Sequence, residues 1–277
     1  MPASPDETPL DASFVRDGDH LLPRPFTRSG WATDTLNGRY LAGLVAWGAE
    51  RHADPDWHPS RLTVDMFRPG TMAPTLVETR IVRDGRRIRV VDSSVLVDGK
   101  EICRGTTVFL RRSHEPRGET WFPPEWAAPD PDDVIPMPRG EQAEWGMPWE
   151  SRGITEWGQL TERRQVWVRE TRPFVEGEEL SPFMRAALAS DMANGQLNAS
   201  PLGLAYINAD LTLTIARLPE GEWIGLDSRS RAAADGVSVG AVDVYDGKGR
   251  IGQVTLIGIA DERNLAADGE VFVPGRP

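Results

Sequence analysis

An internal repeat is the feature of this sequence that most restricts its fold. Residues 62–69 (LTVDMFRP) resemble residues 211–217 (LTLTIAR), at an offset of 149 positions. The segment 98–100 (DGK) recurs as 246–248, at an offset of 148. Two matches in the same order, at nearly the same offset, indicate two copies of one structural unit within the 277-residue chain.

Each copy contains a largely apolar segment of helical length, at residues 38–51 and 182–198. Apolar residues lie almost all round both segments, which is typical of a buried helix rather than a surface helix. Asn37-Gly38 can end the preceding turn and open the first helix. Ser181-Pro182 provides a cap followed by proline at the first helical position of the second.

Alternating segments follow each helix and predict antiparallel strands. Asp-Gly pairs at 84–85, 98–99, 235–236 and 246–247 predict tight hairpin turns, because a primed turn needs positive φ. A helix followed by a meander, twice, predicts an α+β fold whose two sheets pair edge to edge into one continuous sheet. The predicted strands are 61–68, 75–83, 86–97 and 101–112 in copy one, and 206–217, 222–231, 237–245 and 250–260 in copy two.

The composition excludes several classes of function. A net charge of −11 argues against a general nucleic-acid or anionic-membrane binder. Cys103 is the single cysteine, so no internal disulfide is possible and a reducing compartment fits. The first residues lack the basic and apolar regions of a secretory signal, and no apolar run approaches the length of about 18–20 residues that spans a bilayer. We therefore expect a cytoplasmic protein without a membrane or nucleic-acid partner.

Short motifs in both copies resemble one known family. Trp31, Asn37-Gly38 opening an apolar helix, and residues 61–65 (RLTVD) with Arg68-Pro69 resemble the N-terminal hotdog of the thioesterase-like superfamily. Residues 189–191 (ASD), at the end of an apolar helix, resemble the second hotdog of type II acyl-CoA thioesterases. The resemblance implies a double hotdog, which is two copies of a long helix wrapped by an antiparallel sheet.

The resemblance covers about residues 25–112 and 165–262 and suggests how the chain is divided. Residues 115–162 are rich in proline and hold five of the ten tryptophans. We expect an ordered linker draped over the sheet, because prolines oppose regular structure and exposed indoles are costly; as an alternative, its aromatic rings line an acyl pocket. The predicted divisions are an N-terminal arm at 1–24, hotdog 1 at 25–114, the linker at 115–162, hotdog 2 at 163–262 and a tail at 263–277.

The resemblance also implies a catalytic set. In the family, an Asp on the second-copy helix, a Thr or Ser on the next strand and a Gln on the last strand hold the water that attacks the thioester. The Asp corresponds to Asp191, the Thr position to Asn208 and the Gln position to Ile257. Asn208 can still hydrogen-bond a water through its amide, whereas Ile257 cannot. The family set is therefore incomplete in this sequence.

Thioester hydrolysis needs a positioned water, a carboxylate that accepts its proton, and N–H donors for the developing oxyanion. Asp191 is the expected base, and backbone N–H groups near Asn37 and Gly38 are expected at the oxyanion. No metal or cofactor is expected, and the predicted partner is an acyl-CoA or another acyl thioester. The arginines at 80, 83, 86, 87 and 89 could meet coenzyme A phosphates, but a solvated hairpin is the simpler interpretation.

Other interpretations of the sequence have less support. Residues 236–240 (GVSVG) match a nucleophile-elbow pattern, but they alternate like a strand and no histidine follows them. A hotdog lyase or dehydratase is disfavoured because no histidine accompanies an acid near the second helix. The remaining alternative is a catalytically altered or inactive double hotdog that binds acyl groups or coenzyme A. A homo-oligomer is possible, since soluble proteins often form symmetric assemblies.

Overall fold

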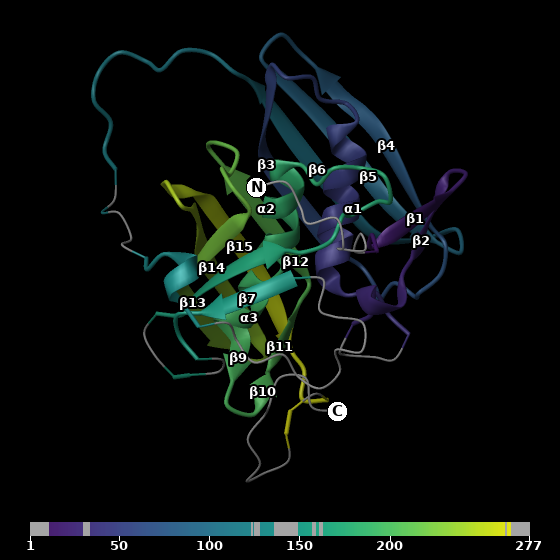
Figure 1. Cartoon of the computed structure of the whole chain (residues 1–277). Helices are drawn as coiled ribbons and strands as arrows, with labels where there is room; N and C mark the ends of the chain where they lie inside the picture. The colour runs from purple at the N-terminus through teal and green to yellow at the C-terminus, as the bar shows by residue number, and fades with distance from the viewer. Residues whose placement is uncertain are drawn as a thin grey trace, which may run out of the picture.

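The computed structural model describes residues 11–29, 34–122, 124, 128–135, 149–156, 159–160, 163–263 and 265–266 (Figure 1). Trp31 and the linker residues Trp126, Trp145 and Trp157 lie outside the described residues. None of the described helices has the length and apolar character that crossing a bilayer requires.

In the described chain, a hairpin, a helical segment and a set of antiparallel strands follow one another in this order twice. Copy one contains β1 (Phe14–Asp17), β2 (His20–Pro23), the 3-10 helix η1 (Pro25–Thr27), α1 (Gly38–Glu50), β3 (Trp57–Met66), β4 (Thr75–Asp84), β5 (Ile88–Val97) and β6 (Lys100–Arg111). Copy two contains η2 (Pro131–Asp133), β7 (Trp149–Gly153), β8 (Gln165–Glu170), α2 (Pro182–Ser190), α3 (Ala193–Asn198), β9 (Ala199–Ser200), β10 (Gly203–Leu204), β11 (Tyr206–Asn208), β12 (Asp210–Ile215), β13 (Trp223–Ala234), β14 (Val237–Asp246) and β15 (Gly249–Ala260).

The larger sheet is nearly symmetric about its centre. Its strand order is β1-β2-β4-β5-β6-β3-β12-β15-β14-β13-β8-β7, with β11 also pairing with β15. Each strand of copy one therefore occupies the mirror-image place of its counterpart in copy two. The hairpin β1–β2, from the expected N-terminal arm, corresponds in this order to β7–β8, so a hairpin precedes the helix in both copies.

The two copies meet at the repeated segments themselves. β3 and β12 pair antiparallel, with Thr63 opposite Thr212 and Leu62 opposite Leu213. Thr63 and Thr212 are the same position of the repeat, since they differ by the offset of 149. A local pseudo-twofold axis therefore passes between these two threonines, and it joins both sheets into the continuous sheet of a double hotdog, as predicted.

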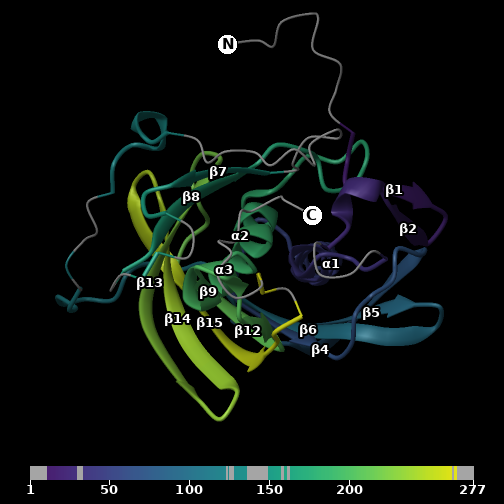
Figure 2. The same ribbon diagram turned by 90° about the horizontal axis from the view of Figure 1, so that it is seen from below.

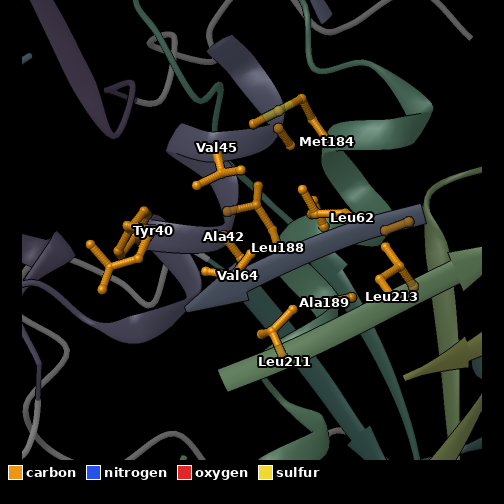
Figure 3. Packing of buried hydrophobic residues seen from close by; sticks show 14 of the residues in the cluster. Tyr40, Ala42, Val45, Leu62, Val64, Met184, Leu188, Ala189, Leu211 and Leu213 are labelled. Atoms are coloured by element: carbon orange, nitrogen blue, oxygen red, sulfur yellow. The ribbon is translucent and has the colours of Figure 1, made fainter. Parts of the chain in front are cut away.

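The helices lie on the inner side of this sheet and pack against each other (Figure 2). Leu62 and Leu213 are fully buried beneath them, and Figure 3 shows these seam leucines close to side chains of both helices. α1 is buried almost all round, as its apolar pattern predicted, with Leu44 and Val45 both 0% exposed. One core thus spans both copies and fixes the position of one helix relative to the other.

The second helix differs from its prediction, because it is broken between α2 and α3. At the break, Met192 N donates to Ala189 O at 3.0 Å and Asn194 N donates to Asp191 O at 3.1 Å. Both bonds span three residues rather than four, so the chain tightens into a short 3-10 turn. The break brings Asp191 to the end of α2, where its side chain can leave the helix.

Two of the four predicted primed turns are present. Asp98-Gly99 and Asp235-Gly236 have positive φ at both residues. Hairpins also form at the other two places, but without a primed turn. Gly85 N donates to Ile88 O at 2.9 Å within a longer loop, and the Asp246 carboxylate instead accepts from the N–H of Lys248 at 2.9 Å. The 236–240 motif runs from the turn into β14, so its rejection as a nucleophile elbow is supported by the structure.

Candidate active site

Asp191 occupies a space that only glycine leaves open. It is the C-cap residue of α2, and its carboxylate lies against Gly38, the first residue of α1. A Cβ built on Gly38 would lie 2.9 Å from Asp191 Oδ1 and 3.2 Å from Oδ2. The end of one copy's helix therefore meets the start of the other's, so the two helices run antiparallel.

The first turn of α1 is arranged to receive this carboxylate. Asn37 is the N-cap residue, as predicted, and its side chain accepts from the backbone N–H of Arg39 at 3.2 Å. The same N–H of Arg39 also hydrogen-bonds the Asp191 carboxylate. The positive end of the helix dipole favours a negative charge at this place. Asn37 and Gly38 thus shape the site, and their role at an oxyanion stays a prediction.

Asn208 completes the hydrogen bonding of Asp191 from copy two. Its Nδ2 donates to Asp191 Oδ1 at 2.9 Å and lies 3.8 Å from the sulfur of Met66, on β3. The bond fixes the amide orientation, because an amide nitrogen can only donate. The Oδ1 atom of Asn208 is the acceptor that remains for a neighbouring donor such as water.

Burial raises the pKa of Asp191, and this is the largest influence on the group. The hydrogen bond from Asn208, the positive charge of Arg39 and the Arg39 backbone N–H act in the opposite direction. A carboxylate with a raised pKa accepts a proton more readily than an ordinary aspartate, as a general base requires.

Ile257 does not join this group, which corrects the site set carried over from the resemblance. Its side chain is 45% exposed, whereas that of Leu256 is 3% exposed, so Ile257 faces the outer side of the sheet. There it lines a groove of about 440 Å³ with Val239 and Asp210. A one-residue change of register moves a side chain to the opposite face of a strand, so a short motif match could not place this position.

The inner-face position directly opposite Asn208 is Gly258. It carries no side chain, and Leu256, the next inner residue, is apolar. The described part of the last strand therefore offers no amide beside Asp191 and Asn208. This agrees with the incomplete catalytic set inferred from the sequence, although the residue responsible is not Ile257.

The sequence did not reveal a buried cation in the first turn of α1. The side chain of Arg39 is 0% exposed, it forms an ion pair with Glu170, and its guanidinium lies 4.0 Å from the centre of the Trp149 ring. The sequence shows only that Arg39 is the one charged residue in α1 before Glu50, and this does not reveal its partner. Two of the five arginines at residues 80–89 that the sequence analysis considered for coenzyme A phosphates form ion pairs at the surface. Arg80 pairs with Asp92, and Arg89 pairs with Asp84.

Family models match most of the chain. The model of the acyl-CoA thioesterase N-terminal domain matches residues 27–110, and that of the acyl-CoA thioesterase C-terminal domain matches residues 114–256. A comparison with curated proteins finds no match.

Solved structures share the fold. An acyl-CoA thioesterase II, TesB2, from Mycobacterium marinum aligns with a TM-score of 0.60 and 22% identity, over 81% of this chain and 88% of that chain. A conserved protein of unknown function with a hot dog fold, from Alicyclobacillus acidocaldarius, aligns with a TM-score of 0.69 and 19% identity, over 90% of this chain and 95% of the other.

Proposed function

The chain belongs to the acyl-CoA thioesterase family, and from this premise we propose that it hydrolyses an acyl-CoA or a related acyl thioester with Asp191 as the general base. The observation that carries the proposal is the Asp191 carboxylate, bonded to Asn208 and seated on Gly38 at the start of α1. Two copies of the fold are needed to assemble this arrangement.

The proposed reaction is a direct attack by water. Asp191 accepts a proton from water as its oxygen bonds to the thioester carbonyl carbon, and Asn208 Oδ1 accepts a hydrogen bond from the second water hydrogen. The oxyanion that forms is stabilised by N–H donors at the start of α1. The C–S bond then breaks, and the leaving thiolate takes the proton from Asp191. The products are a carboxylic acid and free coenzyme A.

A panel of acyl-CoAs of increasing chain length, assayed for release of free thiol, tests this proposal. We expect release by the wild type with at least one chain length and loss of that release in Asp191→Ala. No release with any chain length, or equal release by both proteins, would overturn it.

The second candidate is a double hotdog that binds acyl-CoA without hydrolysing it. It is favoured by Gly258 and Leu256, because the water would be held by two side chains rather than three. A non-hydrolysable thioether analogue of the acyl-CoA separates the candidates. Binding of the analogue without thiol release from the thioester supports this second function. Cytoplasmic location and a role in fatty acid metabolism belong to the first proposal.

The pH dependence of hydrolysis should follow Asp191. A general base works only when ionised, so kcat/KM falls as the pH drops through the pKa of Asp191. Because burial raises that pKa, we expect the acid limb of the profile above the ordinary aspartate value of about 3.9. The measurement is kcat/KM from pH 4 to about 9 in buffers of constant ionic strength. A flat profile across this range would contradict the role of Asp191.

Replacing Ile257 by alanine should leave hydrolysis unchanged, because its side chain lies on the outer face. Asn208→Ala is the matched comparison and should lower kcat/KM about 10- to 100-fold, through loss of a hydrogen bond to a charged group. Steady-state kinetics of both variants provide the check. A loss in Ile257→Ala comparable to that in Asn208→Ala would show that the last strand has another register.

A further inference from the structure

We propose that Arg39 is a positioning residue for Asp191: a buried cation, anchored by Glu170 and Trp149, that holds the carboxylate in its charged form at the start of α1. The inference deepens the proposed function and rests on it for its catalytic consequence. The effect of Arg39 on the charge of Asp191 is a property of the folded protein, and it can be measured whether or not the protein hydrolyses a thioester.

The anchor is formed at one place in copy two. Trp149 of β7 and Glu170 of β8 are directly opposite each other in the antiparallel pair. Arg39 forms the ion pair with Glu170, whose side chain is 6% exposed, and its guanidinium lies 4.0 Å from the centre of the Trp149 ring. The hairpin that precedes α2 therefore binds the first turn of α1 through this buried cation.

The charge of Arg39 is only partly matched by its partners. Nε and Nη1 are buried without a hydrogen-bond partner among the described residues, and a single nitrogen meets Glu170. Burial lowers the pKa of Arg39 to about 10, so the group stays protonated near neutral pH. A buried ion pair of this kind is weak evidence for stability, because desolvation of the charges offsets their attraction. Arg39 directly follows Gly38, against which the Asp191 carboxylate lies, and this points to a different role.

That role concerns the charge of Asp191. The backbone N–H of Arg39 bonds the carboxylate, and the positive charge of its side chain lowers the pKa of Asp191 against the effect of burial. Around the carboxylate, α1 contributes Arg39, β11 contributes the neutral amide of Asn208, and β3 contributes the sulfur of Met66 through Asn208. Glu170 of β8 acts on Asp191 through Arg39, by reducing the positive charge that the carboxylate experiences.

Two further acids lie near the same strands. Asp65 of β3 and Asp210 of β12 are opposite each other across the seam. Asp210 accepts from the backbone N–H of Ile257 at 2.8 Å and lines the outer groove, so it faces away from Asp191. Asp65 is exposed on the same outer face, opposite to the buried inner residues Leu62 and Val64. The effect of Arg39 is therefore separable by mutation from that of these acids.

Two substitutions that break the same ion pair provide the test, because electrostatics predicts opposite results for them. Arg39→Met removes the cation and should raise the pKa of Asp191 by about 1 unit, since an opposite charge nearby shifts a carboxyl group by about 1–3 units. Glu170→Gln removes the counter-charge, exposes Asp191 to the full cation and should lower that pKa. Arg39→Lys keeps a cation and should stay close to the wild type.

The readout is the carboxyl carbon-13 shift of Asp191 against pH, in protein labelled at aspartate and assigned with Asp191→Asn. Opposite shifts in Arg39→Met and Glu170→Gln support the proposal. If the pKa of Asp191 moves in the same direction in both variants, or does not move in Arg39→Met, the proposal is overturned. The ion pair between Arg39 and Glu170 then has a structural role alone. If Arg39→Met does not fold, an unchanged or raised pKa in Glu170→Gln overturns the proposal. If the titrations agree but no variant releases thiol, the proposed hydrolysis alone has failed.

Discussion

Asp191→Asn is expected to lower kcat for thioester hydrolysis by about 10²- to 10⁴-fold, the usual contribution of a general base. The substitution keeps the shape of the side chain, and its single amide oxygen can still accept from Asn208. It removes the negative charge and, with it, the proton acceptor. The measurement is thiol release under saturating substrate.

The same variant should be at least as stable as the wild type at pH 8. Burial raises the pKa of Asp191, so the carboxylate costs stability wherever it is ionised in the folded protein, and this cost grows as the pH rises through the folded pKa. Asparagine removes that cost. Melting temperatures of both proteins at pH 8 provide the check, and a large fall in Asp191→Asn would mean that the carboxylate is a structural group.

Asp210→Asn is the matched control for both measurements. It makes the same chemical change two residues after Asn208, at a carboxylate that bonds the Ile257 N–H on the outer face. We expect hydrolysis close to that of the wild type, because Asp210 does not reach Asp191. Equal losses of hydrolysis in Asp191→Asn and Asp210→Asn would show that catalysis does not depend on a carboxylate on the inner face of the sheet.

Gly38→Ala is expected to lower kcat about 100-fold with little change in stability. The added Cβ would lie 2.9 Å from Asp191 Oδ1, so the carboxylate has to move. A displacement of about 1 Å in a catalytic group can cost about 100-fold in rate. The helix itself tolerates alanine better than glycine, by about 0.5–1 kcal/mol in helix interiors.

Gly43→Ala in the same helix should show the opposite pattern. Its Cβ would lie 2.6 Å from the ring of Phe174 and 2.9 Å from Leu188, in the core between the copies. Overpacking of this kind costs about 1–3 kcal/mol of stability. We expect a lower melting temperature with kcat largely retained. If Gly38→Ala loses stability and keeps its activity, the close contact with Asp191 has no catalytic role.

The fold could be predicted because it is encoded in local patterns that occur twice. The segments 62–69 and 211–217 form the strands that join the copies, so the repeat also identified the seam. The hairpins β1–β2 and β7–β8 could not be predicted in the same way. Their strands have 4 to 6 residues, too short for an alternating pattern to stand out, and their pairing depends on contacts distant in sequence.

Only those site residues that the family resemblance placed correctly, Asp191 and Asn208, could be predicted from the sequence. Asp191 and Asn208 came from the resemblance, and the structure brings them into direct hydrogen-bonding contact. Ile257 was misplaced, because a short motif match does not fix the register of β15, and a shift of one residue moves a side chain to the opposite face. Arg39 was overlooked, because nothing local indicates that a lone arginine after Gly38 will be buried against Glu170 of the other copy.

The most direct test of the account is a single turnover in water enriched in oxygen-18, with enzyme in excess over the acyl-CoA. Free thiol and the isotopic content of the acid are measured in the same reaction. Direct attack by water activated at Asp191 predicts thiol release and one oxygen-18 atom in the acid of the first turnover. Absence of thiol release would contradict hydrolysis, and unlabelled acid would show that the Asp191 carboxylate itself attacks the thioester.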